Sequence, residues 1–334
     1  MKNFSTEFAQ AQSLIEGAKH IVIISHRGPD GDAVGANLGL KLAIIAHFKK
    51  DTTHVVSACV DTPPTSSHFL KTVKDYVRDF NLDGSQPALG TAPDLLISVD
   101  CGASNMVKFG ETKPTIFSGK IPFINIDHHS TNDNFGTVNI VDPNAAAASK
   151  IVYDFLVFCG VSIDRHMATA LLHGLYFDTG SFMHSNTTPE VLRIASQLMW
   201  KGADYKTIVK NQFHTMPVRQ LKLFGRAFER TRVNSKGVTV STLTEKDFEE
   251  TGALNEDTNG AIDYLNSVPE GKLACLLYED RKGLLKGSLR TLSDDVNVSK
   301  LAGIFGGGGH KRASGFAVPG KVELTDEGVK IESK

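Results

Sequence analysis

Three short runs of apolar, largely β-branched residues set the strongest limit on the fold of this 334-residue chain. Residues 21–24, 95–99 and 121–126 have the sequences IVII, LLISV and IPFINI, which suit strands buried on both faces. Helical patterns separate these runs, among them the apolar stretch of residues 33–48. Strands that alternate with helices favour a mostly parallel sheet with right-handed crossovers. The sequence therefore predicts an α/β N-terminal domain with helices flanking a mostly parallel sheet.

Acidic and histidine residues follow each of these runs, and one further acid follows a predicted helix of residues 164–177. The candidate metal ligands are His26, Asp30, Asp32, Asp100, Asp127, His128, His129 and Asp178. Ligands gather at the carboxyl ends of strands in open α/β sheets, so we expect these side chains at one sheet edge. Imidazole and carboxylate ligands without thiolate favour Mn²⁺ over structural zinc. We expect two divalent cations, with Mg²⁺ and Co²⁺ as alternatives to Mn²⁺.

Such a cluster predicts hydrolysis of a phosphate ester or anhydride. Carboxylates packed this closely repel one another, and bound cations would hold them together. A water between two cations loses a proton readily, and the same cations offset charge on a phosphoryl oxygen. Gly31 would let Asp30 and Asp32 turn toward different cations.

The C-terminal part of the chain predicts a second, smaller α/β domain. We expect a catalytic domain over residues 1–215, a connecting helix over residues 216–230 and a substrate-binding domain over residues 231–334, with a cleft between the domains. Four successive glycines near a predicted helix start can present backbone N–H groups to an anion. The predicted phosphate-binding residues are Gly307, Gly308, Gly309, His310, Arg312 and, at a strand end, Arg290.

Composition limits the partners and the compartment. With 36 basic and 37 acidic residues, the formal net charge is -1, which argues against tracking of long nucleic acid and favours small anionic substrates. The four cysteines form no C-x-x-C pair, so neither a zinc knuckle nor a disulfide framework is predicted. The N-terminus has no apolar signal segment and no run reaches membrane-spanning length. We therefore expect a cytoplasmic protein without membrane association.

The motifs HRGPDGDAVG, VDCG, IDHH and LYFDTGSF resemble, in this order, the four motifs of the DHH family of phosphoesterases. GSLRT and GGGGHKRASGF are similar to the DHH-associated C-terminal domain, so the resemblance covers essentially the whole chain. Its layout is closest to the bifunctional oligoribonuclease and pAp phosphatase (nanoRNase) branch. This sequence departs from the usual pattern of the family at the flanking pairs Ala36-Asn37 and His173-Gly174, which leaves details of the substrate open.

The resemblance implies a role for each candidate. His26, Asp30 and Asp100 would hold one cation, and Asp32, Asp100, His128 and Asp178 the other, with Asp100 bridging. Asp127 would orient a ligand, and His129 would face the substrate or leaving group, so these two form the catalytic pair. The C-terminal domain would hold the nucleotide end of the substrate.

The function predicted first is therefore a Mn²⁺-dependent phosphoesterase that acts on short RNA and on 3′,5′-bisphosphorylated adenosine (pAp). Hydrolysis of cyclic di-AMP or pApA is an alternative, and a non-catalytic nucleotide- or nucleic-acid-binding module is an alternative of another class. A pyrophosphatase would have a different second domain, and a long-strand exonuclease would have an additional nucleic-acid-binding domain. The native metal, the preferred substrate, the cleavage polarity and the oligomeric state, including a homodimer, stay open.

Overall fold

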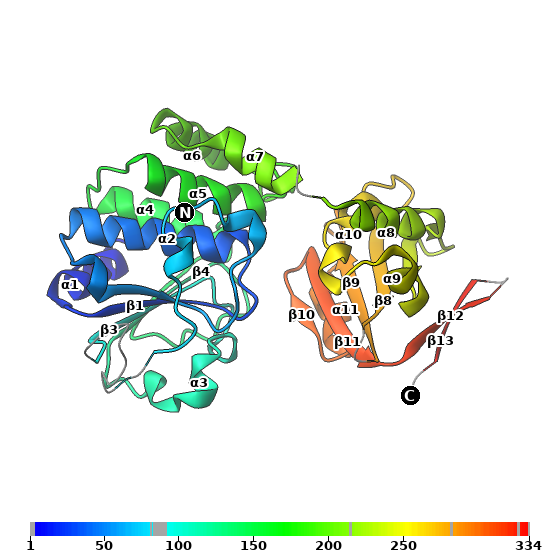
Figure 1. The fold of residues 1–334 in the computed structure, drawn as a ribbon, viewed down its shortest axis with the longest axis horizontal. Coiled ribbons are helices and arrows are strands. Elements are labelled where there is room, and N and C mark those ends of the chain that lie inside the picture. The colour runs from blue at the N-terminus through cyan, green and yellow to red at the C-terminus, as the bar shows by residue number, and fades with distance from the viewer. Residues whose placement is uncertain are drawn as a thin grey trace. The chain divides into compact units, whose positions relative to one another are not determined.

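The computed structural model describes residues 4–80, 82, 92–213, 216–280, 283–325 and 328–332. Contacts within the chain divide it into two compact units, Met1–Thr215 and Met216–Lys334. Each unit builds its own sheet and its own hydrophobic core (Figure 1). Every helix in the described part of the chain is too short or too polar to span a lipid bilayer.

The first unit contains a five-stranded parallel sheet, which confirms the predicted fold class. Its strands are β1 (Ile21–Ser25), β2 (Val55–Ala58), β3 (Leu95–Val99), β4 (Phe123–Asp127) and β5 (Val138–Val141). They lie in the order β2-β1-β3-β4-β5, and every pairing is parallel. The sequence analysis missed β5, because its four residues, VNIV, are too few to show a clear pattern.

Helices cover both faces of this sheet. They are α1 (Ser5–Gly17), α2 (Gly31–His47), α3 (Phe109–Thr112), α4 (Ala148–Phe158), α5 (Arg165–Asp178), α6 (Pro189–Trp200) and α7 (Tyr205–Phe213). In Figure 1, α2, α4 and α5 lie on one side of the sheet and α3 on the other. Alternate strand residues point to opposite faces, so Ile23 packs in the core with α1, α2, α4 and α5, whereas Ile24 packs on the side of α3. The sheet is therefore buried on both faces, as its apolar strands require.

The second unit is built on a six-stranded mixed sheet. Its strands are β6 (Arg232–Val233), β7 (Val238–Leu243), β8 (Leu273–Glu279), β9 (Leu284–Arg290), β10 (Gly308–Gly309) and β11 (Ala313–Pro319). The order is β10-β11-β9-β8-β7-β6, and among these pairings the one between β7 and β8 is parallel. A separate hairpin follows, with β12 (Lys321–Thr325) and β13 (Gly328–Glu332).

The helices of the second unit lie on opposite faces of its sheet. They are α8 (Val218–Glu229), α9 (Glu245–Thr251), α10 (Ala261–Leu265) and α11 (Val298–Ile304). Leu276 of β8 shares a core with α8, α9 and α10, whereas Cys275 packs on the side of α11. Within the span expected to connect the domains, α8 contributes Leu223 and Phe224 to the core of the second unit.

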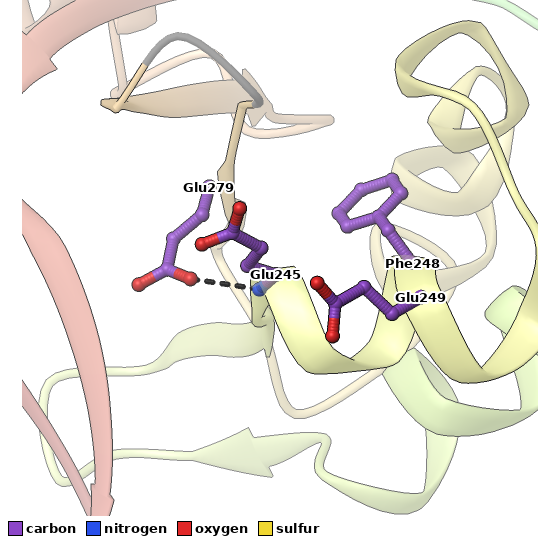
Figure 2. A pocket seen from close by; sticks show the side chains of 4 residues that line it. All are labelled: Glu245, Phe248, Glu249 and Glu279. Carbon is purple, nitrogen blue, oxygen red and sulfur yellow. Dashed lines mark hydrogen bonds between the residues drawn. The ribbon is translucent and has the colours of Figure 1, made fainter.

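A buried carboxylate ties the C-terminal hairpin to this unit. Glu279 accepts hydrogen bonds from Glu245 N and Val322 N, both at 2.7 Å. The same residue lines a cavity of about 240 Å³ together with Glu245, Phe248 and Glu249 (Figure 2). Because both of its oxygens accept backbone N–H groups, Glu279 has a structural role at this position.

The predicted helix after the glycine run is wrong. His310 and Arg312 lie in the turn between β10 and β11, so a strand follows them. The antiparallel partner of β11 is β9, with Ala313 opposite Arg290. Pairing with β9, which lies distant in sequence, outweighs the local glycine pattern.

Candidate metal centre

The parallel sheet brings the polar strand ends to one edge. His26 follows β1, Asp100 follows β3, and Asp127 is the last residue of β4. These three strands are neighbours in the order β1-β3-β4. From β1 the chain passes to β2 on one side of β1 and then to β3 on its other side. The carboxyl ends of β1 and β3 therefore form the topological switch point, where open α/β sheets bind ligands.

The structure groups six of the candidates into two sets with the spacing of metal ligands. His26, Asp30 and Asp100 form one set, and Asp32, His128 and Asp178 form a second. Asp100, Asp127 and His129 form a further group of this kind, which shares Asp100 with the first set. Within each set, the potential ligand atoms lie within 4.8 Å of one another. These sets match the division that the motif resemblance implied, apart from the shared residue.

Asp100 lies between the two sets. Its Oδ2 is 3.7 Å from His26 Nε2, and its Oδ1 is 3.4 Å from His128 Nε2. Oδ1 is buried and has no hydrogen-bond partner among the described residues. The backbone of Asp100 has a φ of 59°, a left-handed conformation that costs a non-glycine residue about 1–3 kcal/mol. An orphaned carboxylate oxygen on a strained residue is the arrangement that a bridging cation would satisfy.

His26 and His128 both direct Nε2 toward Asp100. His128 Nδ1 lies 3.2 Å from Ala145 O, and His26 Nδ1 lies 2.7 Å from Arg27 O. A carbonyl oxygen only accepts, so Nδ1 carries the proton and Nε2 is the ligand atom. This outer hydrogen bond is typical of metal-bound histidine, and it shows that the residues fit a divalent cation.

The two acids of the first motif are held by backbone N–H groups. Asp30 caps α2 by accepting from Asp32 N at 2.9 Å and Ala33 N at 3.0 Å. Asp32 accepts from Ala148 N at 2.6 Å and Ser149 N at 3.0 Å, and so caps α4 from a distant part of the chain. Sequence reasoning missed this second cap, because the local pattern contains no sign that α2 and α4 meet.

A glycine allows the close approach of α5 to this site. A Cβ atom at Gly174 would lie 2.1 Å from Ser149 Oγ and 2.5 Å from Asp32 Oδ1. Both distances are far shorter than a van der Waals contact. Glycine at position 174 is therefore required by packing against Ser149 and the candidate ligand Asp32.

The carboxyl and imidazole groups of this cluster have perturbed pKa values. Burial, and then the charges of Asp100 and Asp178, raise the pKa of Asp30 to about 6. Burial would lower the pKa of His26, but the hydrogen bond and charge of Asp100 raise it to about 10. Burial would raise the pKa of Asp100, but the imidazoles of His128 and His26 hold it below its ordinary value.

Asp127 and His129 form a separate pair beside the two sets. His129 Nδ1 lies 2.8 Å from Asp127 Oδ1 and 3.6 Å from Asp100 Oδ1. Asn132 Nδ2 donates to Asp127 Oδ2 at 2.6 Å, a contact that the sequence analysis did not consider. The polar run His129-Ser130-Thr131-Asn132 directly after the motif was the available signal.

The predicted phosphate-binding residues lie together at one end of the second sheet. Arg290 pairs with Ala313, and Thr291 N donates to Arg312 O at 3.0 Å. Arg290 Nε lies 3.5 Å from Asp263 Oδ1, and Arg312 forms an ion pair with Asp294. The structure therefore brings both arginines to the turn that contains His310.

The glycine run does not form the predicted row of available N–H groups. Gly306 N donates to Gly303 O, Gly307 N to Ala302 O, and His310 N to Ala313 O. A Cβ atom at Gly307 would lie 2.2 Å from Gly315 O. At that position, glycine is required for close packing of β10 against β11.

Comparisons with known proteins agree with this organisation. Residues 20–175 match the DHH family, N-terminal domain, and residues 235–330 match the DHHA1 domain. The bifunctional oligoribonuclease and PAP phosphatase NrnA of Thermus thermophilus is 30% identical over 316 residues, covering 93% of this chain and 87% of that protein. The probable bifunctional oligoribonuclease and PAP phosphatase NrnA of Streptococcus mutans is 27% identical over 310 residues, covering 93% of each.

A solved structure extends the likeness to the fold. The exopolyphosphatase-related protein of Bacteroides fragilis superimposes with a TM-score of 0.81 at 26% identity, covering 93% of this chain and 90% of that one. Sequence and fold therefore agree over most of the chain. The protein belongs to the DHH family, with a DHHA1 domain in its C-terminal part, as its motifs predicted.

Proposed function

We propose that this protein is a metal-dependent phosphoesterase that hydrolyses short RNA oligonucleotides and pAp. The observation that carries the proposal is the pair of ligand sets that meet at Asp100. The relatives from Thermus thermophilus and Streptococcus mutans, whose names state these two activities, match along nearly the whole chain. The net charge of -1 supports small substrates over long nucleic acid.

His26, Asp30 and Asp100 would hold one divalent cation, and Asp32, Asp100, His128 and Asp178 would hold the second. Two such cations, for which the oxygen and imidazole ligands favour Mn²⁺, would activate a water and offset the charge of the phosphoryl group. Asp100 would bridge them, because its two carboxylate oxygens face different ligand sets.

His129 would contact the reacting phosphate or the leaving oxygen through Nε2. Its Nδ1 is held by Asp127, so Nε2 is the nitrogen that can meet a substrate oxygen. Asp127 is fully buried and would act as the orienting group. One imidazole would then face the substrate, while the imidazoles of His26 and His128 would hold the cations.

The second unit would bind the nucleotide part of the substrate. Arg290, Arg312 and His310 supply charge and donors at one end of its sheet. A guanidinium can hold phosphate through two hydrogen bonds or stack on a base. Gly307 N and His310 N already donate to Ala302 O and Ala313 O, so the side chains would carry most of the contact with an anion.

A substrate panel tests the proposal. Metal-stripped full-length protein would be supplied with Mn²⁺, Mg²⁺ or Co²⁺ and tested on pAp, pApA, RNA of two to five nucleotides, a long single strand, cyclic di-AMP and pyrophosphate. We expect the fastest turnover on short RNA and pAp with Mn²⁺. Faster cleavage of the long strand, or of cyclic di-AMP, would reject the proposed substrate class. Activity without any divalent cation would reject the metal role.

We also infer a cytoplasmic location, which the four cysteines support because all are free thiols. A homodimer stays a prediction, which the sedimentation coefficient of the purified protein would decide.

A further inference from the structure

The side chain of Asn132 connects the ends of β3 and β4 behind the metal centre. Its Nδ2 donates to Asp127 Oδ2 at 2.6 Å and to Cys101 O at 3.0 Å. Cys101 directly follows Asp100, the residue between the two ligand sets. One amide group therefore links the strand end that carries the central carboxylate to the strand end that carries the histidine pair.

The orientation of this amide is determined by its oxygen. Oδ1 accepts from Asn134 N at 2.8 Å and from Asn125 Nδ2 at 2.9 Å. A backbone N–H can only donate, so the amide oxygen must lie on that side and the nitrogen must face Asp127. The buried carboxylate of Asp127 thus accepts one hydrogen bond at each oxygen, from Asn132 and from His129.

We propose that Asn132 is a positioning residue for His129 and acts through Asp127. This inference rests on the proposed contact of His129 with the substrate. Without the Nδ2 donor, one oxygen of a fully buried carboxylate would lose this partner, which is unfavourable for a buried charged group. The carboxylate would rotate toward other donors and lose its alignment with His129 Nδ1. The side chain of Asn132 bonds to Asp127, Cys101, Asn125 and Asn134, none of which is among the six residues assigned to the cations, so cation binding would change little.

A neighbouring asparagine provides a matched control. Asn139, in β5, accepts from Asn125 Nδ2 at 3.1 Å and from Gly136 N at 2.9 Å. Its own Nδ2 donates to Gly136 O at 2.7 Å. It therefore belongs to the same hydrogen-bonded group of amides, but its contacts are with Asn125 and Gly136. Substitution of Asn139 should cost stability without misaligning His129.

The kinetic test compares Asn132→Asp with Asn139→Ala. Asn132→Asp keeps the size of the side chain and the acceptor for Asn134 N, but it replaces the donor by an oxygen that repels Asp127. We expect its kcat on the short-RNA substrate to fall about 10–100-fold, with KM changed by less than about threefold. Asn139→Ala should keep its kcat within about twofold. Equal losses in the two variants would overturn the proposal.

Exchanging the carboxylate at position 127 with the amide at position 132 tests whether the hydrogen bond between them is what matters for kcat. In the double variant Asp127→Asn with Asn132→Asp, the new amide at position 127 can donate to the new carboxylate at position 132 and still accept from His129. A positioning role predicts a higher kcat for this double variant than for Asn132→Asp alone. A kcat at or below that of the single variant would contradict the proposal.

A spectroscopic readout separates this inference from the proposed function. In full-length protein with ¹⁵N-labelled histidine and bound Mg²⁺, His129 should show a protonated Nδ1, with its signals assigned by comparison with His129→Gln. In Asn132→Asp, or in Asn132→Ala if the first variant does not fold, the two ring-nitrogen shifts should move toward each other. Unchanged shifts would overturn the inference even if the enzyme is active. Changed shifts in a protein that cleaves neither RNA nor pAp would reject the proposed function and support the positioning role.

Discussion

The metal centre and the glycine-rich turn differ in how the chain holds them. Most residues of the candidate centre lie at the carboxyl ends of strands in a parallel sheet or in the loops that follow, and Asp32, Asp100 and His128 are buried. The glycine run belongs to β10 and its turn at the edge of an antiparallel part of the second sheet. Parallel strands must place their carboxyl ends at one edge, so local motifs at those ends predict a common site.

The same reasoning failed for the glycine-rich turn. The hydrogen bonds of its backbone depend on the segments that contact it, and those segments come from elsewhere in the chain. Several N–H groups that the sequence offered to an anion are hydrogen-bonded within the unit instead. The position of side chains at the carboxyl ends of parallel strands can therefore be predicted from local motifs. Whether a backbone N–H group is available to a ligand depends on which segment it contacts in the folded unit. Four predictions test this contrast.

The largest loss of activity is expected for a substitution at the carboxyl end of β3, with a control substitution before the start of the same strand. Asp100→Asn should lower kcat at least about 10³-fold, because it removes the charge that would lie between two cations. The matched control, Asp94→Asn, lies before the same strand, where Asp94 accepts from Lys19 N and His20 N. It should keep its activity with a small loss of stability. Steady-state kinetics with Mn²⁺ decide the comparison, and similar activities for the two variants would break it.

Arg312→Ala should act on binding in the second unit. We expect KM for a dinucleotide to rise about 10–100-fold, because a charged hydrogen bond to phosphate is lost, with little change for a small generic phosphodiester. Lys311→Ala, at the exposed neighbouring position, serves as the control and should leave both values unchanged. If Arg312→Ala raised KM equally for both substrates, the proposed nucleotide-binding role of the second unit would be contradicted.

Cation binding should stabilise the first unit in particular. At a Mn²⁺ concentration of about 100 times Kd, a site absent from the unfolded chain adds about 2.7 kcal/mol to the free energy of unfolding. Hydrogen exchange of the full chain should slow in β1 and β3 but not in β8 and β9. Asp178→Asn should reduce this protection. Equal slowing in both sheets, or full protection of the variant, would contradict the assignment.

Glu279→Gln should have the smallest effect. The neutral side chain can still accept a hydrogen bond from Glu245 N, but its amide nitrogen cannot accept from Val322 N. We expect a loss of about 1–3 kcal/mol in stability and unchanged kinetics, measured by denaturant unfolding and by turnover. Glu249→Gln, which lines the same cavity from an exposed position, should leave both unchanged (Figure 2). Lost activity would show that this cavity has a functional role.

Much of the candidate metal centre could be predicted, because most of its residues follow strands that apolar runs in the sequence indicate. His26, Asp100 and Asp127 occupy the positions expected for residues at parallel strand ends. Asn132 could not be assigned a role in the same way. Its contact with Asp127 depends on the path of the loop after β4, and no periodic pattern describes that path.

By itself, the sequence determined the α/β class, the order of the motifs and the chemical type of the ligands. Apolar periodicity and the handedness of crossovers are local or near-local properties, so they can be inferred without knowing which distant segments meet. The tertiary structure decided that Asp32 caps α4, that Asn132 holds Asp127, and that Gly308 and Gly309 pair with β11. Each of these depends on contacts between separate segments, whose geometry is set only when the whole unit packs.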